Sequence, residues 1–219
     1  GAKPVHWCVD CGSSLAEAEV EYEDKVSPAI DVLFALRDPT RLGLAADSAV
    51  FAVIWTTTPW TLPANQAVSA HPEFMYDLVQ TPRGVLILAH DLVAACMARY
   101  GYTEWATLKS LPGAALEGLQ FQHPFLDRLV PMILGEHVTL DTGTGLVHTA
   151  PGHGLEDYVV GARYKLAVEN PVGDDGKFYA STPLVGGQLV WAANKTVVAA
   201  LSENQHLLHE EKLKHSYPH

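Results

Sequence analysis

The chain has few cysteines, no long apolar run and no leader-like start, and each absence excludes a class of protein. Three cysteines among 219 residues do not make a disulfide framework, which favours a reducing compartment. No apolar run approaches the roughly 18 residues of a membrane span. The N-terminus has neither the basic start nor the apolar stretch of a secretory signal. We therefore expect a cytoplasmic protein that does not enter a membrane.

The shortage of basic residues limits how this chain can bind nucleic acid. It has 14 Lys and Arg against 25 Asp and Glu, a net charge of −11 with histidine neutral. A module that held a long stretch of nucleic acid by itself would need a basic face to displace counterions from phosphates. Any nucleic acid bound here should be short, or be held by other parts of a larger protein.

The hydrophobic pattern predicts one mixed domain that is rich in strands. Apolar residues make up 48% of the chain and charged residues 18%, which is ordinary for a globular protein. Asp91 is expected to cap the start of a helix and Gly101 its end. Many strands with a few helices, and no regular alternation, indicate a curved or closed sheet. The expected strands are 30–36, 50–55, 76–79, 85–88, 132–140 and 207–213, and the expected helices are 91–100, 154–165 and 188–202.

A threonine-rich loop, residues 55–65 (WTTTPWTLPAN), follows the buried strand expected at 50–55. Thr58 precedes Pro59 and is therefore biased toward extended geometry. Two prolines restrict the loop, so that its hydroxyls and backbone N–H groups can be held in a fixed orientation. The plainer interpretation, which is the more common one for such a loop alone, is a turn whose threonines satisfy local backbone groups.

A glycine-rich segment, residues 141–158 (DTGTGLVHTAPGHGLEDY), is the second unusual stretch. Its glycines let the backbone approach a ligand closely, because they lack a side chain and permit positive φ. Plainer interpretations remain open: His148 as a satisfied core residue, and Asp157 as a favourable partner of a helix dipole. The Gly-x-x-x-x-Gly-Lys-Ser/Thr pattern of a phosphate-binding loop is absent.

Together, the two segments closely resemble the editing domain of isoleucyl-tRNA synthetases, a connective polypeptide inserted into the catalytic domain of these class I enzymes. The resemblance runs over essentially the whole chain, from Lys3-Pro4-Val5-His6-Trp7-Cys8 to His215-Ser216-Tyr217-Pro218-His219. The editing domains of valyl and leucyl enzymes are similar, but they have a motif that resembles Thr-Thr-Arg-Pro where this chain has Thr57-Thr58-Pro59. They also generally lack a histidine at the place of His148.

The resemblance implies a mixed α+β, mainly β fold with a curved or closed β-barrel core and peripheral helices. It divides the chain into a partial zinc-ribbon-like segment at 1–22, the editing domain at 23–205, and a C-terminal strand at 206–219 that returns to the zinc-ribbon or linker region. Neither the HIGH nor the KMSKS signature of the synthetic site occurs, so the chain should not charge tRNA.

The activity implied by the resemblance is hydrolysis of valine wrongly attached to isoleucine tRNA, and of valyl-adenylate. A binding pocket gains only about 1–3 kcal/mol from the one extra methylene of isoleucine, a general magnitude for which this pair of amino acids is itself the standard example. A second pocket must therefore exclude isoleucine by size. The implied partners are the 3′ CCA end of mischarged tRNA(Ile) and the aminoacylation domain of the parent enzyme, and we expect a monomer.

The resemblance also implies roles for individual residues. Asp157 pairs with the α-ammonium of the substrate by a charge-assisted hydrogen bond, and His148 belongs to the wall that limits side-chain size. A positioned water attacks the ester, without a covalent nucleophile. A Thr–His–Asp triad is a minor alternative that would need His148 within reach of a threonine, and His153 is expected to pack under the glycine turn. The remaining implied site residues are Thr56, Thr57 and Thr58, which orient water, ribose or oxyanion, and Trp60 and Asn65, which shape or hold the terminal adenosine.

Cys8 and Cys11 look like half of a structural zinc site. Such a site needs four ligands, and a second pair is missing from this chain. The resemblance places that pair directly after residue 219, so we expect zinc in the full-length parent but not here, and no cofactor for editing. Cys96 should be a buried small residue. A free-standing protein that edits in trans and a non-enzymatic zinc-ribbon module that binds RNA or protein are the alternative functions.

Overall fold

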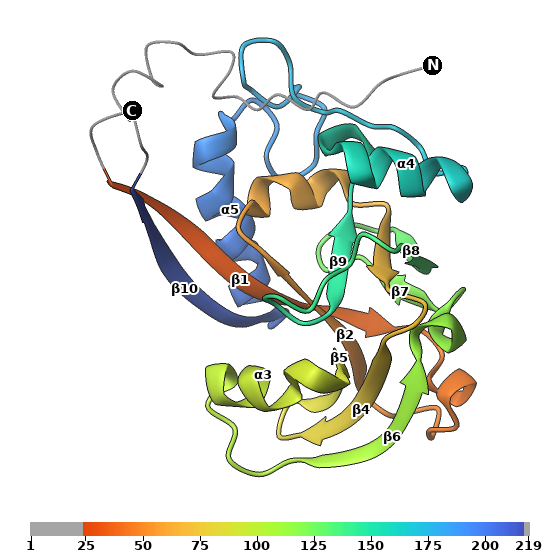
Figure 1. The fold of residues 1–219 in the computed structure, drawn as a ribbon. Helices are drawn as coiled ribbons and strands as arrows, with labels where there is room; N and C mark the ends of the chain where they lie inside the picture. Colours follow the sequence, from red (N-terminus) through yellow and green to blue (C-terminus); the bar gives the residue numbers. More distant parts are fainter. Residues whose placement is uncertain (1–23, 217–219) are drawn as a thin grey trace.

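The structure, a computed structural model, describes residues 24–216 and consists of a curved sheet with helices at its periphery (Figure 1). The segment expected at 1–22, with Cys8 and Cys11, lies outside the described residues. The helices are α3 (Val93–Tyr100), α4 (Leu155–Arg163) and α5 (Val190–Glu203), and the strands are β1 (Asp24–Leu36), β2 (Val50–Thr56), β3 (Ala67–Ala70), β4 (Met75–Thr81), β5 (Gly84–Ala89), β6 (Ala106–Pro112), β7 (Gln120–Gln122), β8 (Leu129–Leu134), β9 (Leu146–Thr149) and β10 (Leu207–Ser216).

The sheet is mixed and its ends do not meet. Its strand order is β6-β4-β5-β2-β1-β7-β8-β3-β9, and β10 pairs with β1 outside this path. The closed barrel that we expected is therefore wrong for residues 24–216, because closure needs a continuous ladder between the end strands. β9 instead lies alongside β2. The two are joined by the Thr144 hydroxyl, which donates to the Val53 carbonyl at 2.6 Å.

Most expected elements are confirmed, with shifted boundaries. The strands expected at 30–36 and 50–55 are found in β1 and β2. Those expected at 76–79 and 85–88 are found in β4 and β5, which pair as an antiparallel hairpin. The helix at 91–100 is confirmed as α3, but Asp91 does not cap it. A 3-10 turn over His90–Leu92 comes first, and Leu92 precedes the α-helix without a side-chain cap. Gly101 does end the helix, with a left-handed φ of 76°.

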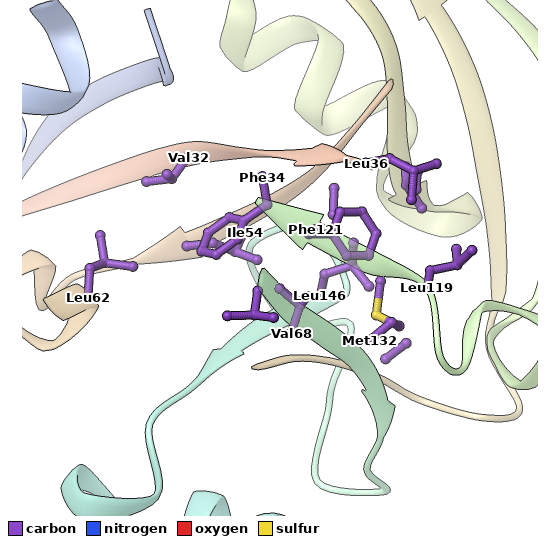
Figure 2. Packing of buried hydrophobic residues seen from close by; sticks show 14 of the residues in the cluster. Val32, Phe34, Leu36, Ile54, Leu62, Val68, Leu119, Phe121, Met132 and Leu146 are labelled. Atoms are coloured by element: carbon purple, nitrogen blue, oxygen red, sulfur yellow. The ribbon is translucent and has the colours of Figure 1, made fainter. Parts of the chain in front are cut away.

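The core lies on both faces of the sheet, because neighbouring residues of a strand point in opposite directions. On β1, Val32 and Phe34 belong to the larger cluster, while Leu33 belongs to a second cluster against α3. Figure 2 shows the larger cluster, in which side chains from β1, β2, β3, β7, β8 and β9 meet. This packing fixes the end of β2 beside the start of β9. Within the described residues, no helix is both long and apolar enough to cross a membrane.

Candidate functional site

A cavity of about 310 Å³ lies where the end of β2 meets the segment that leads into β9. It brings together the two stretches that stood out in the sequence. One wall is the end of β2, and another is the first turn of α4. The lining residues are Trp55, Thr56, Thr57, His137, Thr139, residues 142–147, Glu156 and Asp157. Of the predicted site residues, Thr56, Thr57 and Asp157 therefore share one cavity.

The threonine loop is held by its own hydroxyls. The buried Thr56 hydroxyl accepts a hydrogen bond from the Thr58 N–H at 3.1 Å, and the Thr61 hydroxyl donates to the Thr58 carbonyl at 2.8 Å. A 3-10 helix over Pro59–Ala64 follows. The plainer interpretation of the loop is thus correct for Thr56 and Thr61. Thr57 differs, because it lines the cavity and its hydroxyl has no hydrogen-bond partner within residues 24–216.

His148 on β9 supports this loop from the protein interior. Its Nε2 lies 2.8 Å from the Thr61 hydroxyl oxygen, and its Nδ1 lies 3.0 Å from Nδ2 of Asn65. The Asn65 amide nitrogen also donates to the Ala67 carbonyl at 2.9 Å, which fixes the orientation of the amide. Nδ1 must then accept, so the proton is on Nε2. Because the Thr61 hydroxyl proton already goes to the Thr58 carbonyl, the Thr61 oxygen accepts from the ring.

This direction of hydrogen bonding argues against a Thr–His–Asp triad. His148 is within reach of a threonine, as a triad requires, but it donates to Thr61 where a general base would accept. The other ring nitrogen faces an amide instead of Asp157. Burial lowers the pKa of His148 to about 3, with smaller contributions from His123 and His153. The ring is therefore neutral and is a poor base.

Asp157 stands in the first turn of α4 and is one of two carboxylates that line the cavity. Its Oδ2 accepts from the Ala150 N–H at 3.0 Å. Burial raises its pKa to about 6, a shift opposed by the Ala150 N–H and increased by the neighbouring carboxylate of Glu156. The carboxylate is thus mostly ionised at neutral pH. No basic side chain among the described residues forms an ion pair with it.

The other predicted residues lie outside the cavity lining. Thr58 is exposed, and the backbone N–H of Trp60 donates to Asn194 on α5 at 3.0 Å. Asn65 is fully buried and holds the His148 ring, so it cannot hold an adenosine directly. His153 packs edge-on against the Trp60 ring, with ring centroids 5.1 Å apart. Packing under the glycine turn was expected for His153, and the ring contact found is with Trp60.

The other lining residues were not predicted as site residues. Trp55, Glu156 and residues 142–147 lie within the two unusual segments, whereas His137 and Thr139 lie outside them. His137 follows β8, carries a buried Nε2 with no partner within residues 24–216, and has a pKa that burial lowers. No local motif marked it. Among the described residues, no three His, Cys, Asp or Glu side chains are grouped so that they could hold a metal ion.

Solved structures with a similar fold come from tRNA synthetases. The crystal structure of GlLeuRS-CP1 superposes with a TM-score of 0.63 at 16% identity, covering 82% of this chain and 97% of that chain. The editing domain of the P. knowlesi cytosolic leucyl-tRNA synthetase gives a TM-score of 0.63 at 10% identity, covering 90% and 98%. A search of protein-family models found no match. The fold is that of a synthetase editing domain.

Sequence relatives are more specific. The chain is 64% identical to the isoleucine–tRNA ligase of Thiobacillus denitrificans, 60% to that of Chromobacterium violaceum and 58% to that of Thioalkalivibrio sulfidiphilus. Each match covers all of this chain and 24% of the relative. The chain therefore belongs to the isoleucine–tRNA ligase family, and it spans about a quarter of the length of these relatives.

Proposed function

We propose that this chain hydrolyses the ester that joins valine to the terminal adenosine of isoleucine tRNA, and valyl-adenylate as a second substrate. One observation carries the proposal. The Thr57 hydroxyl and the Asp157 carboxylate line the same cavity, and neither side chain is used up by a strong partner within the described residues. Membership of the isoleucine–tRNA ligase family suggests the substrate, and the two side chains in the cavity suggest how it is hydrolysed.

Asp157 is the anchor for the substrate. An aminoacyl ester carries an α-ammonium, and a charge-assisted hydrogen bond between this group and a carboxylate is strong in a partly buried site. The Ala150 N–H holds Oδ2, so Oδ1 is left for the ligand. The ammonium replaces solvent as the carboxylate's partner and orients the amino acid. The ester carbonyl, one bond from the α-carbon, is then placed beside the end of β2.

Hydrolysis then needs a water and a place for developing negative charge. The water oxygen attacks the carbonyl carbon, the bond from that carbon to the ribose oxygen breaks, and the ribose oxygen leaves with a proton. Thr57 is free to donate to the oxyanion or to hold the water, and Thr56 fixes the strand end on which Thr57 lies. A ribose hydroxyl of the substrate assists this transfer. No side chain forms a covalent bond.

Size exclusion follows from the volume and support of the site. A cavity of about 310 Å³ is at the small end for ligand pockets, which favours a small amino acid. Family resemblance assigns the size limit to His148. In the structure its ring braces Thr61 and Asn65, so we propose that it sets the limit by holding the threonine loop in position.

The proposed partners follow from the charge of the chain. At −11, it is unsuited to gripping a whole tRNA, and only the 3′ CCA end need enter the cavity. The aminoacylation domain of the parent enzyme would hold the rest, in the cytoplasm. We propose that the chain acts as a monomer without a cofactor.

Deacylation of Val-tRNA(Ile) by the chain tests the function directly. We expect release of valine above the spontaneous rate, while Ile-tRNA(Ile) under the same conditions stays intact. Thr57→Val removes only the hydroxyl from a side chain of similar shape, so it should lower the rate without changing the fold. A chain that releases valine no faster than buffer, or that releases isoleucine equally fast, would contradict the proposal.

A further inference from the structure

Arg99, near the end of α3, makes hydrogen bonds to two separate parts of the cavity region with one guanidinium. Its Nε and Nη2 donate to the two carboxylate oxygens of Asp31, at 3.1 and 2.8 Å. Nη2 also donates to the Gly143 carbonyl at 3.4 Å. The Asp31 side chain is fully buried on β1, and that of Arg99 is 18% exposed. This is a largely buried, two-pronged ion pair, and Nη2 also reaches the Gly143 carbonyl and, at 3.6 Å, the Cys96 sulfur.

One acceptor, Asp31, lies next to a lining residue, and the other, Gly143, lines the cavity itself. In the ladder of β1 and β2, Asp31 pairs with Trp55, so the two side chains project from the same face of the sheet. Trp55 lines the cavity and leads directly into Thr56 and Thr57. Gly143 also lines the cavity. Its left-handed backbone, φ +80°, lies so close that an added Cβ would be 3.3 Å from the Cβ of Trp55. Arg99 therefore links Asp31, beside Trp55, to Gly143.

We propose that Arg99 is a positioning residue for the hydrolysis, because it fixes the segment 142–145 relative to the end of β2. The inference rests on the proposed function and gives Arg99 no contact with the substrate. Asp157 is held separately, by the Ala150 N–H. Loss of Arg99 should therefore disturb the place where water and oxyanion are held while leaving the ammonium anchor intact.

Arg99→Lys is the most informative substitution. Lysine keeps the positive charge for Asp31 but lacks the planar fork that serves two carboxylate oxygens and a carbonyl together. Because small misplacements of reacting groups are costly, we expect kcat for Val-tRNA(Ile) deacylation to fall by about tenfold to a hundredfold. KM should stay close to that of the wild-type chain, since the anchor is unchanged.

Tyr100→Phe is the matched control. The Tyr100 hydroxyl donates to the same Asp31 carboxylate but makes no hydrogen bond to Gly143. The Tyr100→Phe substitution removes one buried hydrogen bond to Asp31 and leaves the hydrogen bonds of Arg99 to Asp31 and Gly143 in place. We expect it to lower the melting temperature while kcat remains near wild type. Equal losses of kcat in the two variants, or a loss for Arg99→Lys confined to KM, would overturn the assignment.

Two further measurements keep the inference testable if Arg99→Lys fails to fold or if the wild-type chain does not hydrolyse the ester. Gly143→Ala places a methyl group against Trp55 without touching the ion pair, and should reproduce the loss of kcat. Independently of activity, the backbone amide resonances of Thr57 and Gly143 should move in Arg99→Lys and stay in Tyr100→Phe. Unmoved resonances overturn the inference, whereas a wild-type chain without deacylation overturns only the proposed function.

Discussion

His148 donates the proton on its Nε2 to the hydroxyl oxygen of Thr61, 2.8 Å away. Thr61 belongs to the threonine loop and in turn donates to the Thr58 carbonyl. The ring is therefore hydrogen-bonded to this loop, and the Thr61 hydroxyl links it to Thr58. A neutral imidazole in this position acts as a brace. Its removal should change what the cavity admits more than how fast the chemistry runs.

His148→Ala should therefore allow the chain to hydrolyse Ile-tRNA(Ile), because the threonine loop loses its brace and the pocket gains room for a methylene. We expect isoleucine release to rise well above the wild-type background, while valine release changes less. His153→Ala is the control, since His153 is a half-buried histidine with a lowered pKa that packs on Trp60. If His148→Ala still spares isoleucine, the size limit lies elsewhere.

Asp157→Asn should lower kcat/KM for deacylation strongly. The amide can still accept from the Ala150 N–H through its oxygen, so the fold should survive, but the charge that pairs with the ammonium is gone. Hydrogen bonds to charged groups contribute about 1.5–3 kcal/mol, or about tenfold to a hundredfold in kcat/KM. Glu156→Gln, which changes the neighbouring carboxylate in the same cavity, should have a much smaller effect. Retained activity in Asp157→Asn would place the anchor elsewhere.

The pH dependence of kcat/KM should show a rising limb near pH 6. Burial raises the pKa of Asp157 to about 6, so the carboxylate becomes protonated below this pH and loses its attraction for the ammonium. The midpoint should appear in the wild-type chain and in Glu156→Gln. It should be absent from the residual activity of Asp157→Asn, and a midpoint that persists there belongs to another group.

Mild acid should also destabilise the chain. Burial lowers the pKa values of His123 and His153 to about 4 and that of His148 to about 3, against an ordinary value of 6.5. Below pH 6.5 the unfolded chain binds protons that the folded chain refuses, so stability is lost as pH falls from 6.5 toward 4. The loss is at most about 1.4 kcal/mol per pH unit for each histidine. Asp157, with its raised pKa, opposes this with the opposite sign between about 6 and 3.8.

Urea unfolding at several pH values in this range checks the prediction. The free energy of unfolding should fall with pH, and the slope should be smaller in His153→Phe, which removes one of the buried histidines without adding a charge. A flat profile in the wild-type chain would mean that these rings are protonated in the folded protein, against the hydrogen bonds described for His148.

Strong local patterns predicted much of the fold, and weak ones did not. The apolar run of β2, and the turn between β4 and β5, were sufficient to predict these strands from the sequence. β3 is short and made of small residues, and β6 is exposed along almost its whole length, so neither shows an alternation that can be recognised. Closure of the sheet was beyond local patterns, since it depends on the pairing of strands far apart in sequence. Asp91 failed as a cap because a 3-10 turn displaced the start of α3.

Two unusual segments, and the family that they resemble, pointed to Thr56, Thr57 and Asp157 as site residues. The structure places these three side chains around one cavity. Arg99 was not predicted, because a single arginine in a helix carries no signal until the structure brings it between Asp31 and Gly143. Asn65 was predicted as a ligand contact and proved to be buried support. Sequence alone does not separate a group that faces a ligand from one that holds such a group in place.

The pairing of β1 with β10, which sets Asp24 opposite Ser216, has a mechanical consequence. The chain enters and leaves the described body through one antiparallel ribbon, which bends more readily than it stretches. The two strands pair over most of their length, and β10 also contacts α3 and α5. A host protein that continues from both strands would therefore be joined to the cavity-bearing body through a single paired ribbon.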